Sequence, residues 1–231
     1  MTTRFNDSES PWQETYAGYI RGELMEFLGQ HGPGANLLLP ARAGISPNDA
    51  PEDLRFSMAD ELGDLLWFGT DIASRISVPI SQVCLDALRQ YAGYTKTPPA
   101  TFPDLAEAAV AHASDITVPT RLGLRYPNIP SIPGHSSLAS NPLYLFIRTT
   151  GRLTRALDQG AHDLSPPGAT ELEPVQDPVR SLGTYFLVLA YIASTRLRIP
   201  VNSIVDFNMA KLRHRRLHGK EKDIKFDRSW A

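Results

Sequence analysis

The chain has 231 residues, of which 42% are hydrophobic and 21% are charged, as is ordinary for a water-soluble globular protein. Its formal net charge of -2 gives no overall attraction to nucleic acid or to an anionic membrane surface. The single cysteine, Cys84, excludes an internal disulfide framework and suits a reducing compartment. The N-terminal stretch lacks the apolar core of a secretory signal, and no apolar run is long enough to cross a bilayer, so we expect a cytoplasmic protein.

Apolar residues recur at three- and four-residue steps along most of the chain, which predicts helices. Segments containing Pro and Gly separate these helices. The predicted helices cover residues 16–28, 51–76, 80–91, 105–113, 143–157, 179–197 and 201–217. No segment shows the alternation typical of a strand, and residues 119–142 are expected to be irregular. The predicted class is therefore all-α.

Two parts of the chain resemble each other, which indicates an internal duplication. Residues 61–74 (ELGDLLWFGTDIAS) align with residues 181–194 (SLGTYFLVLAYIAS), sharing Leu-Gly and a final Ile-Ala-Ser. Pro79 then aligns with Pro200 after one inserted residue, and the helices that begin the two copies also match. We expect the copies to pack as a pseudo-dimer within one chain. The predicted organisation is a helical unit over 1–96, a linker with a short helix over 97–141, a degenerate second unit over 142–218 and a polar tail over 219–231.

Two acidic pairs lie in the first unit. Glu23 and Glu26 are three residues apart, as are Glu61 and Asp64, so each pair projects from one face of its helix. A single pair of this kind is most often a solvated helix face. Carboxylates at the edge of a buried stripe, however, are costly unless a cation lies between them, and a hard divalent cation is the simplest candidate. The presence of both pairs together favours a metal site.

The second unit carries different residues at the aligned positions. Arg152 and Arg155 replace the first acidic pair, and Ser181 and Thr184 replace the second. The final helix of the second unit instead provides polar and cationic residues: Asn208, Lys211 and Arg215. This asymmetry predicts one composite site, with metal on the acidic unit and phosphate contacts from the basic unit. Surface ion pairs are the alternative interpretation of the two arginines on the earlier helix.

These patterns together resemble a known family. E-x-x-E on one helix, E-x-x-D within ELGDLLW on the next and the ending N-x-x-K-L-x-x-R resemble the MazG-like all-α nucleoside triphosphate pyrophosphohydrolases. The resemblance covers residues 16–91 well and residues 143–216 as a degenerate copy. The duplicated, asymmetric plan is also similar to that of the dimeric-type dUTPases of the same superfamily. The spacer between Glu26 and Glu61 is longer than in compact family members.

The resemblance implies a metal-dependent hydrolysis. Its metal ligands would be Glu23, Glu26, Glu61 and Asp64, which would hold Mg²⁺, or Mn²⁺ in its place. A metal-bound water would attack the α-phosphorus of a nucleoside or deoxynucleoside triphosphate and release pyrophosphate, with Glu26 or Glu61 orienting or deprotonating the water. The predicted substrate contacts are Asn208, Lys211, Arg215, Arg152 and Arg155.

Other functions stay open at this level. A non-catalytic helical protein that binds a nucleotide and regulates another protein is the main alternative. Nucleic-acid binding through the cationic end of the last helix is the weakest, because no aromatic residues interleave with the charges. The base, the sugar and the association of two chains into a homodimer also stay open.

Overall fold

The computed structural model describes residues 12–29, 36–39, 46–95, 97–119, 135–161, 178–219 and 224–231. Its elements are the helices α1 (Trp12–Gly29), α3 (Glu52–Arg75), α4 (Ile80–Ala92), α5 (Phe102–Ala111), α6 (Pro142–Ala161), α7 (Pro178–Tyr191) and α8 (Val201–His218), a π-helix η1 (Ile192–Leu197), and the strands β1 (Thr117–Pro119) and β2 (His135–Ser137). The prediction of an all-α protein is confirmed.

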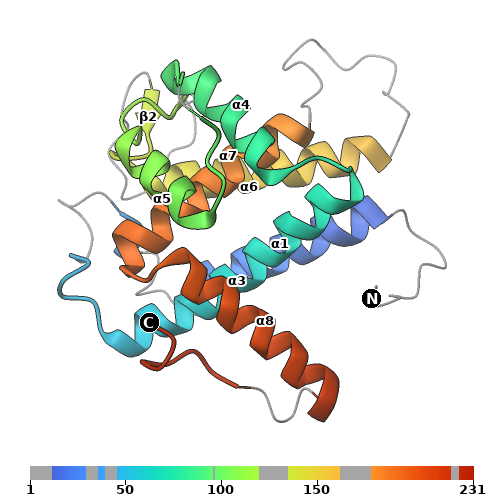
Figure 1. Cartoon of the computed structure of the whole chain (residues 1–231), viewed down its shortest axis with the longest axis vertical. Helices are drawn as coiled ribbons and strands as arrows, with labels where there is room; N and C mark the ends of the chain where they lie inside the picture. The colour runs from blue at the N-terminus through green and yellow to red at the C-terminus, as the bar shows by residue number, and fades with distance from the viewer. Residues whose placement is uncertain are drawn as a thin grey trace.

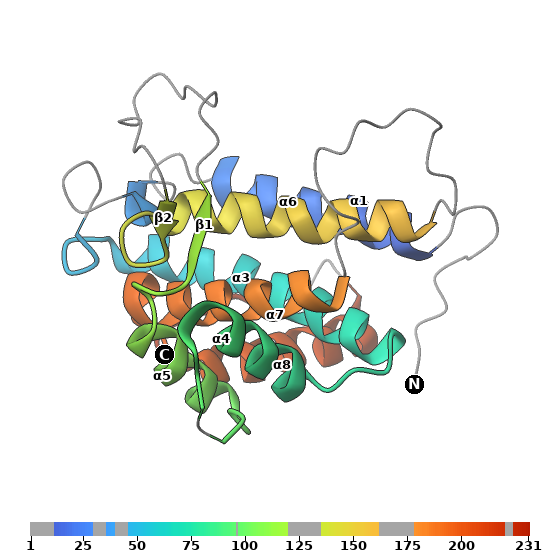
Figure 2. The ribbon, with the colours of Figure 1, turned by 90° about the horizontal axis from the view of Figure 1, so that it is seen from above.

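The helices are stacked in three layers (Figures 1 and 2). The first layer pairs α1 with α6, the second contains α3 and α7, and the third contains α4, α5 and α8. On one side of the middle layer, α1 packs against α3 and α6 packs against α7. On the other side, α8 packs against α3 and α4 packs against α7. The middle layer is therefore covered on both sides.

Helix α7 lies at the centre because its sequence is apolar around the whole helix. All eleven residues from Ser181 to Tyr191 are buried, among them Tyr185 and Phe186. A helix that is hydrophobic on every side is stable only when other elements cover all of it. The continuous run Leu187 to Ala190, each residue fully buried, fixes this helix as the core of the fold.

A small antiparallel ladder departs from the predicted absence of strands. Thr117 pairs with Ser137 and Pro119 with His135, so β2 falls within the stretch expected to be irregular. Each strand has three residues. A run this short cannot show alternation, and its partner lies beyond a long loop, so the sequence pattern gives no signal for it.

Two chain reversals, one in each half, have the same backbone geometry. Ser77 and Arg198, each two residues before a proline that precedes a helix, have φ angles of 58° and 56°. Among the described residues they are the only non-glycine residues with positive φ. This left-handed conformation is uncommon for residues with a side chain, so its occurrence at two aligned positions indicates a repeated turn.

The turn in the second half is one residue longer than the turn in the first half, and the extra residue lies within η1. In the first half the amide of Val78 donates to the carbonyl of Ala73 at 3.0 Å, and in the second Ile199 donates to Ala193 at 3.1 Å. The first bond spans five residues and the second spans six. A π-helix accommodates one extra residue within a helical turn. The helix predicted to run to residue 197 therefore ends at Tyr191 as an α-helix and continues as a π-helix.

Two aligned glycines allow the middle and third layers to approach closely. A Cβ atom on Gly63 would lie 3.1 Å from the Cβ of Asn208 on α8. A Cβ atom on Gly183 would lie 3.1 Å from the Cβ of Ala87 on α4 and 2.0 Å from the carbonyl oxygen of Val83. Both helix crossings therefore depend on the missing side chain of a glycine.

The last residues of the chain are anchored to the bundle. Phe226 is buried and packs against Phe56 on α3 and Phe207 on α8, and Trp230 also contacts Phe207. The guanidinium of Arg228 forms an ion pair with Glu52. The described part of the segment predicted as a polar tail thus contributes two aromatic side chains to the packing of α3 and α8.

Candidate metal centre

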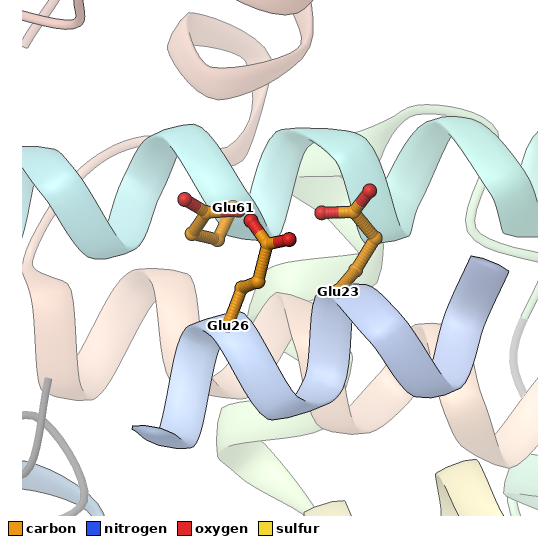
Figure 3. A group of neighbouring side chains, drawn as sticks. All are labelled: Glu23, Glu26 and Glu61. Atoms are coloured by element: carbon orange, nitrogen blue, oxygen red, sulfur yellow. The ribbon is translucent and has the colours of Figure 1, made fainter. Parts of the chain in front are cut away.

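Three glutamates from the first and middle layers converge on one point. Glu23 and Glu26 lie one turn apart on α1, and Glu61 faces them from α3 (Figure 3). One carboxylate oxygen from each residue lies within 4.8 Å of those of the other two. The two helices run in opposite directions. Tyr16 near the start of α1 donates a hydrogen bond to Asp71 near the end of α3, whereas Glu26 further along α1 lies by Glu61, which precedes Asp71. The three-residue spacing on α1 therefore places both of its glutamates opposite the middle of α3.

Within the described part of the chain, the charged neighbours that shift the pKa values of Glu23 and Glu61 most are other carboxylates. Burial, and then the charges of Asp64, Glu61 and Glu26, raise the pKa of Glu23 to about 8. Burial and the charges of Asp60, Glu26 and Asp64 also raise the pKa of Glu61. Carboxylates close to one another resist ionisation unless a cation joins them. The donors are all oxygen atoms, which suits a hard divalent cation such as Mg²⁺ or Mn²⁺.

Asp64, the fourth predicted ligand, lies beside the cluster but is already paired. Its Oδ2 atom accepts a hydrogen bond of 2.8 Å from the Nζ of Lys211. Its charge still acts on Glu23 and Glu61. Asp64 is thus the link between the three glutamates on one side of α3 and the lysine on the other.

Lys211 also bonds to Asp60, a residue that the sequence reasoning missed. Asp60 and Asp64 are four residues apart and share the face of α3 that α8 covers. Burial would lower the pKa of Lys211, but the two carboxylates outweigh that effect and raise the pKa of Lys211. The i, i+4 spacing was a signal for this second acidic pair. Its cationic partner lies 151 residues away, where no local pattern connects the two.

Asn208 lies one turn before Lys211 and faces the same side of α3. It is 3% exposed, and neither its amide nitrogen nor its amide oxygen has a hydrogen-bond partner among the residues that the structure describes. Its side chain lies against Gly63. Arg215, one turn after Lys211, is near enough for its charge to lower the pKa of Asp60, although burial raises that pKa overall. Three of the five predicted substrate contacts therefore lie on one helix, next to the acidic pair of α3.

The other two predicted contacts are not brought to the acidic cluster. Arg152 and Arg155 lie on α6, which packs against α1 and α7. No hydrogen bond or ion pair within the described ranges joins either arginine to Glu23, Glu26 or Glu61. The Nε atom of Arg152 is buried and has no hydrogen-bond partner in the described segments. The groups that the structure brings together come from α1, α3 and α8, and the roles of Arg152 and Arg155 in substrate binding stay predictions.

Two further side chains of α3, those of Asp71 and Trp67, are not part of the acidic cluster. Asp71 accepts hydrogen bonds from Tyr16 and Arg75, and burial together with Asp71 raises the pKa of Tyr16 to about 12. Trp67 is half-buried and packs edge to face with Phe68. Asp71 therefore belongs to the contact between α1 and α3 rather than to the group of three glutamates.

A cleft opens beside Asp60, which is one of its lining residues. It has a volume of about 820 Å³ and lies between the start of α3 and the C-terminal segment. Ser57 and Asp60 form one wall, and Lys225 and Ser229 lie on the other. The anchored C-terminal segment therefore shapes an open space that reaches one of the two carboxylates bonded to Lys211.

Comparisons with models of protein families, with curated proteins and with solved structures give no match for this chain. No helix in the described part of the chain is both long and apolar enough to cross a membrane. The fold and the acidic cluster therefore carry the functional argument by themselves.

Proposed function

We propose that this protein is a divalent-metal-dependent hydrolase that converts a nucleoside or deoxynucleoside triphosphate to the monophosphate and pyrophosphate. The observation that carries the proposal is the convergence of Glu23, Glu26 and Glu61 within 4.8 Å, with the pKa of Glu23 raised to about 8. An oxygen-lined group with surplus negative charge is suited to Mg²⁺ or Mn²⁺. A triphosphate, itself strongly negative, could enter such a site only with a cation between it and the carboxylates.

The proposal includes the internal duplication suggested by the sequence. It is supported by the matched turns at Ser77 and Arg198 and by the matched glycines Gly63 and Gly183. The packing is also consistent with a two-fold relation between the halves. Such a relation would exchange α1 with α6, α3 with α7 and α4 with α8, and each main contact among these six helices would map onto an observed contact. Under that exchange the contact of α3 with α8 becomes the contact of α7 with α4. The MazG-like unit would then occur twice, with its acidic residues kept in the first copy alone.

Each group of the site has a proposed role. Glu23, Glu26 and Glu61 would hold the metal, which polarises phosphate oxygens and lowers the pKa of a water molecule when bound. Glu26 is the most exposed of the three and is suited to orient or deprotonate the attacking water, as Glu61 also could. Arg215 lies on the α8 side of α3 and is suited to contact phosphate oxygens, whereas the side chain of Asn208 is buried against Gly63.

The test is an assay of pyrophosphate release from a panel of nucleoside and deoxynucleoside triphosphates, with Mg²⁺ and with a chelator. We expect release from at least one substrate with Mg²⁺ and none with the chelator. Glu61→Gln should lower kcat by at least about 100-fold, since it removes a charged metal ligand. Glu107→Gln, on the exposed face of α5, is the matched control and should leave the rate unchanged.

The same assay distinguishes the non-catalytic alternative. Metal-dependent binding of a triphosphate without any pyrophosphate release would contradict the proposed reaction and favour a nucleotide-binding regulator. Equal activity of the wild-type protein and Glu61→Gln would contradict the assignment of the site.

A further inference from the structure

Lys211 is a cation enclosed by the fold beside the proposed metal site. The residue is only 1% exposed. Burying a charged amine removes its contacts with water, which is costly unless other groups of the protein compensate for the charge. Its Nζ atom bonds to both Asp60 and Asp64, which project from neighbouring turns of α3. A cation held between two carboxylate oxygens occupies the position that a metal ion would otherwise take between them.

The lysine and its carboxylates occur together at the crossing of α8 on α3, and neither residue type occurs at the aligned positions of the crossing of α4 on α7. At the positions aligned with Asp60 and Asp64 the second unit has Arg180 and Thr184. The position aligned with Lys211 is Gln90 of α4, which is exposed. The cation is thus present only where an acidic pair needs one.

The packing of α8 on α3 keeps the amine in this place. Gly63 lies between Asp60 and Asp64 in the sequence, and its missing side chain lets α8 approach at Asn208. Lys211 follows Asn208 by one turn, so the amine reaches both carboxylates from a helix that is itself held in the core. The ring of Phe207 lies 5.8 Å from Nζ and covers it from another side.

We infer that Lys211 serves as the second cation of the acidic site, so that the protein binds a single divalent ion, at Glu23, Glu26 and Glu61. This inference rests on the proposed metal site. Asp64 would then be held by the lysine rather than by a second ion, and Lys211 is a positioning residue. Removing the amine would vacate a two-carboxylate position that a second divalent ion could enter.

The test counts Mn²⁺ ions bound to the metal-free full-length protein by titration followed with electron paramagnetic resonance. We expect one ion for the wild-type protein, one for Lys211→Arg, which keeps the charge, and two for Lys211→Ala. Lys225→Ala is the control for loss of an exposed lysine next to the same cleft, and should bind one ion.

Two acidic variants keep the inference testable if Lys211→Ala does not fold. Asp60→Asn should bind one ion with the affinity of the wild-type protein, whereas Glu61→Gln should bind it at least about tenfold more weakly. Two ions on the wild-type protein, one ion on a folded Lys211→Ala, or a tenfold loss of affinity in Asp60→Asn would each overturn the inference. Failure of the proposed reaction would appear separately, as one bound ion without pyrophosphate release.

Discussion

The Nζ atom of Lys211 on α8 lies 2.8 Å from the Oδ2 atom of Asp64 on α3, across 147 residues of sequence. Through this bond a residue of the second half is connected to the carboxylates of the first. Its amine also bonds to Asp60, so a single buried cation holds two acidic residues of the helix that carries Glu61.

Removal of this lysine should destabilise the protein strongly. Lys211→Ala leaves Asp60 and Asp64 partly buried without their cation, and we expect a loss of about 3 kcal/mol in the free energy of unfolding. Equilibrium unfolding in urea measures this change. Arg21→Ala breaks an exposed ion pair with Asp158 and should cost less than about 1 kcal/mol. Equal losses in the two variants would contradict the structural role of the buried pair.

The metal-free protein should lose stability as the pH rises from about 4.5 to about 8. Burial and the neighbouring carboxylates raise the pKa of Glu23 from 4.5 to about 8 in the folded chain. In that window the folded state therefore binds more protons than the unfolded state, and the free energy of unfolding falls with increasing pH. The measurement is urea unfolding at a series of pH values in a chelating buffer. Glu23→Gln should reduce this slope, and an unchanged slope would contradict the assignment.

Two glycines of the second half, Gly183 on α7 and Gly151 on α6, should respond in opposite ways to substitution by alanine. Gly183→Ala would place a Cβ atom 2.0 Å from the backbone oxygen of Val83, and should destabilise the protein by about 3 kcal/mol. Gly151→Ala, where nothing lies within 4 Å of the added atom, should stabilise α6 by about 0.5–1 kcal/mol. Thermal unfolding of both variants beside the wild-type protein measures the difference. A gain in stability for Gly183→Ala would show that α4 and α7 are not closely packed.

The C-terminal segment should contribute to the stability of the whole protein. Phe226→Ala removes a ring that packs on Phe56 and Phe207, and should cost about 3 kcal/mol. The neighbouring Lys225→Ala is the control and should change the stability by less than about 0.5 kcal/mol. Urea unfolding that is the same for the two variants would mean that the segment is not part of the cooperative core.

Most of the fold could be predicted because its helices have strong apolar periodicity and clear breaks. The helix expected over residues 51–76 is observed as Glu52–Arg75, and the one expected over 80–91 as Ile80–Ala92. The one residue inserted before Pro200 was visible in the alignment of the two halves. Its accommodation as the π-helix Ile192–Leu197 could not be predicted, because a longer turn would also accommodate one extra residue. The packing of Phe226 was equally hidden, since a lone aromatic residue in a polar segment gives no periodic signal.

The candidate site divides in the same way. The three-residue spacing of Glu23 and Glu26 was enough to place them on one face of α1, and the structure brings Glu61 to them. Their binding of metal stays a prediction. The engagement of Asp64 by Lys211 could not be read from local patterns, because it depends on how α8 crosses α3 at Gly63.

The crossing of third-layer helices between the halves has one more consequence. Helix α8 covers α3, and α4 covers α7, so each half closes the core of the other. We therefore expect each half to need the other for stable folding. Deletion of residues 142–218 would remove the helix that covers α3, which carries Glu61.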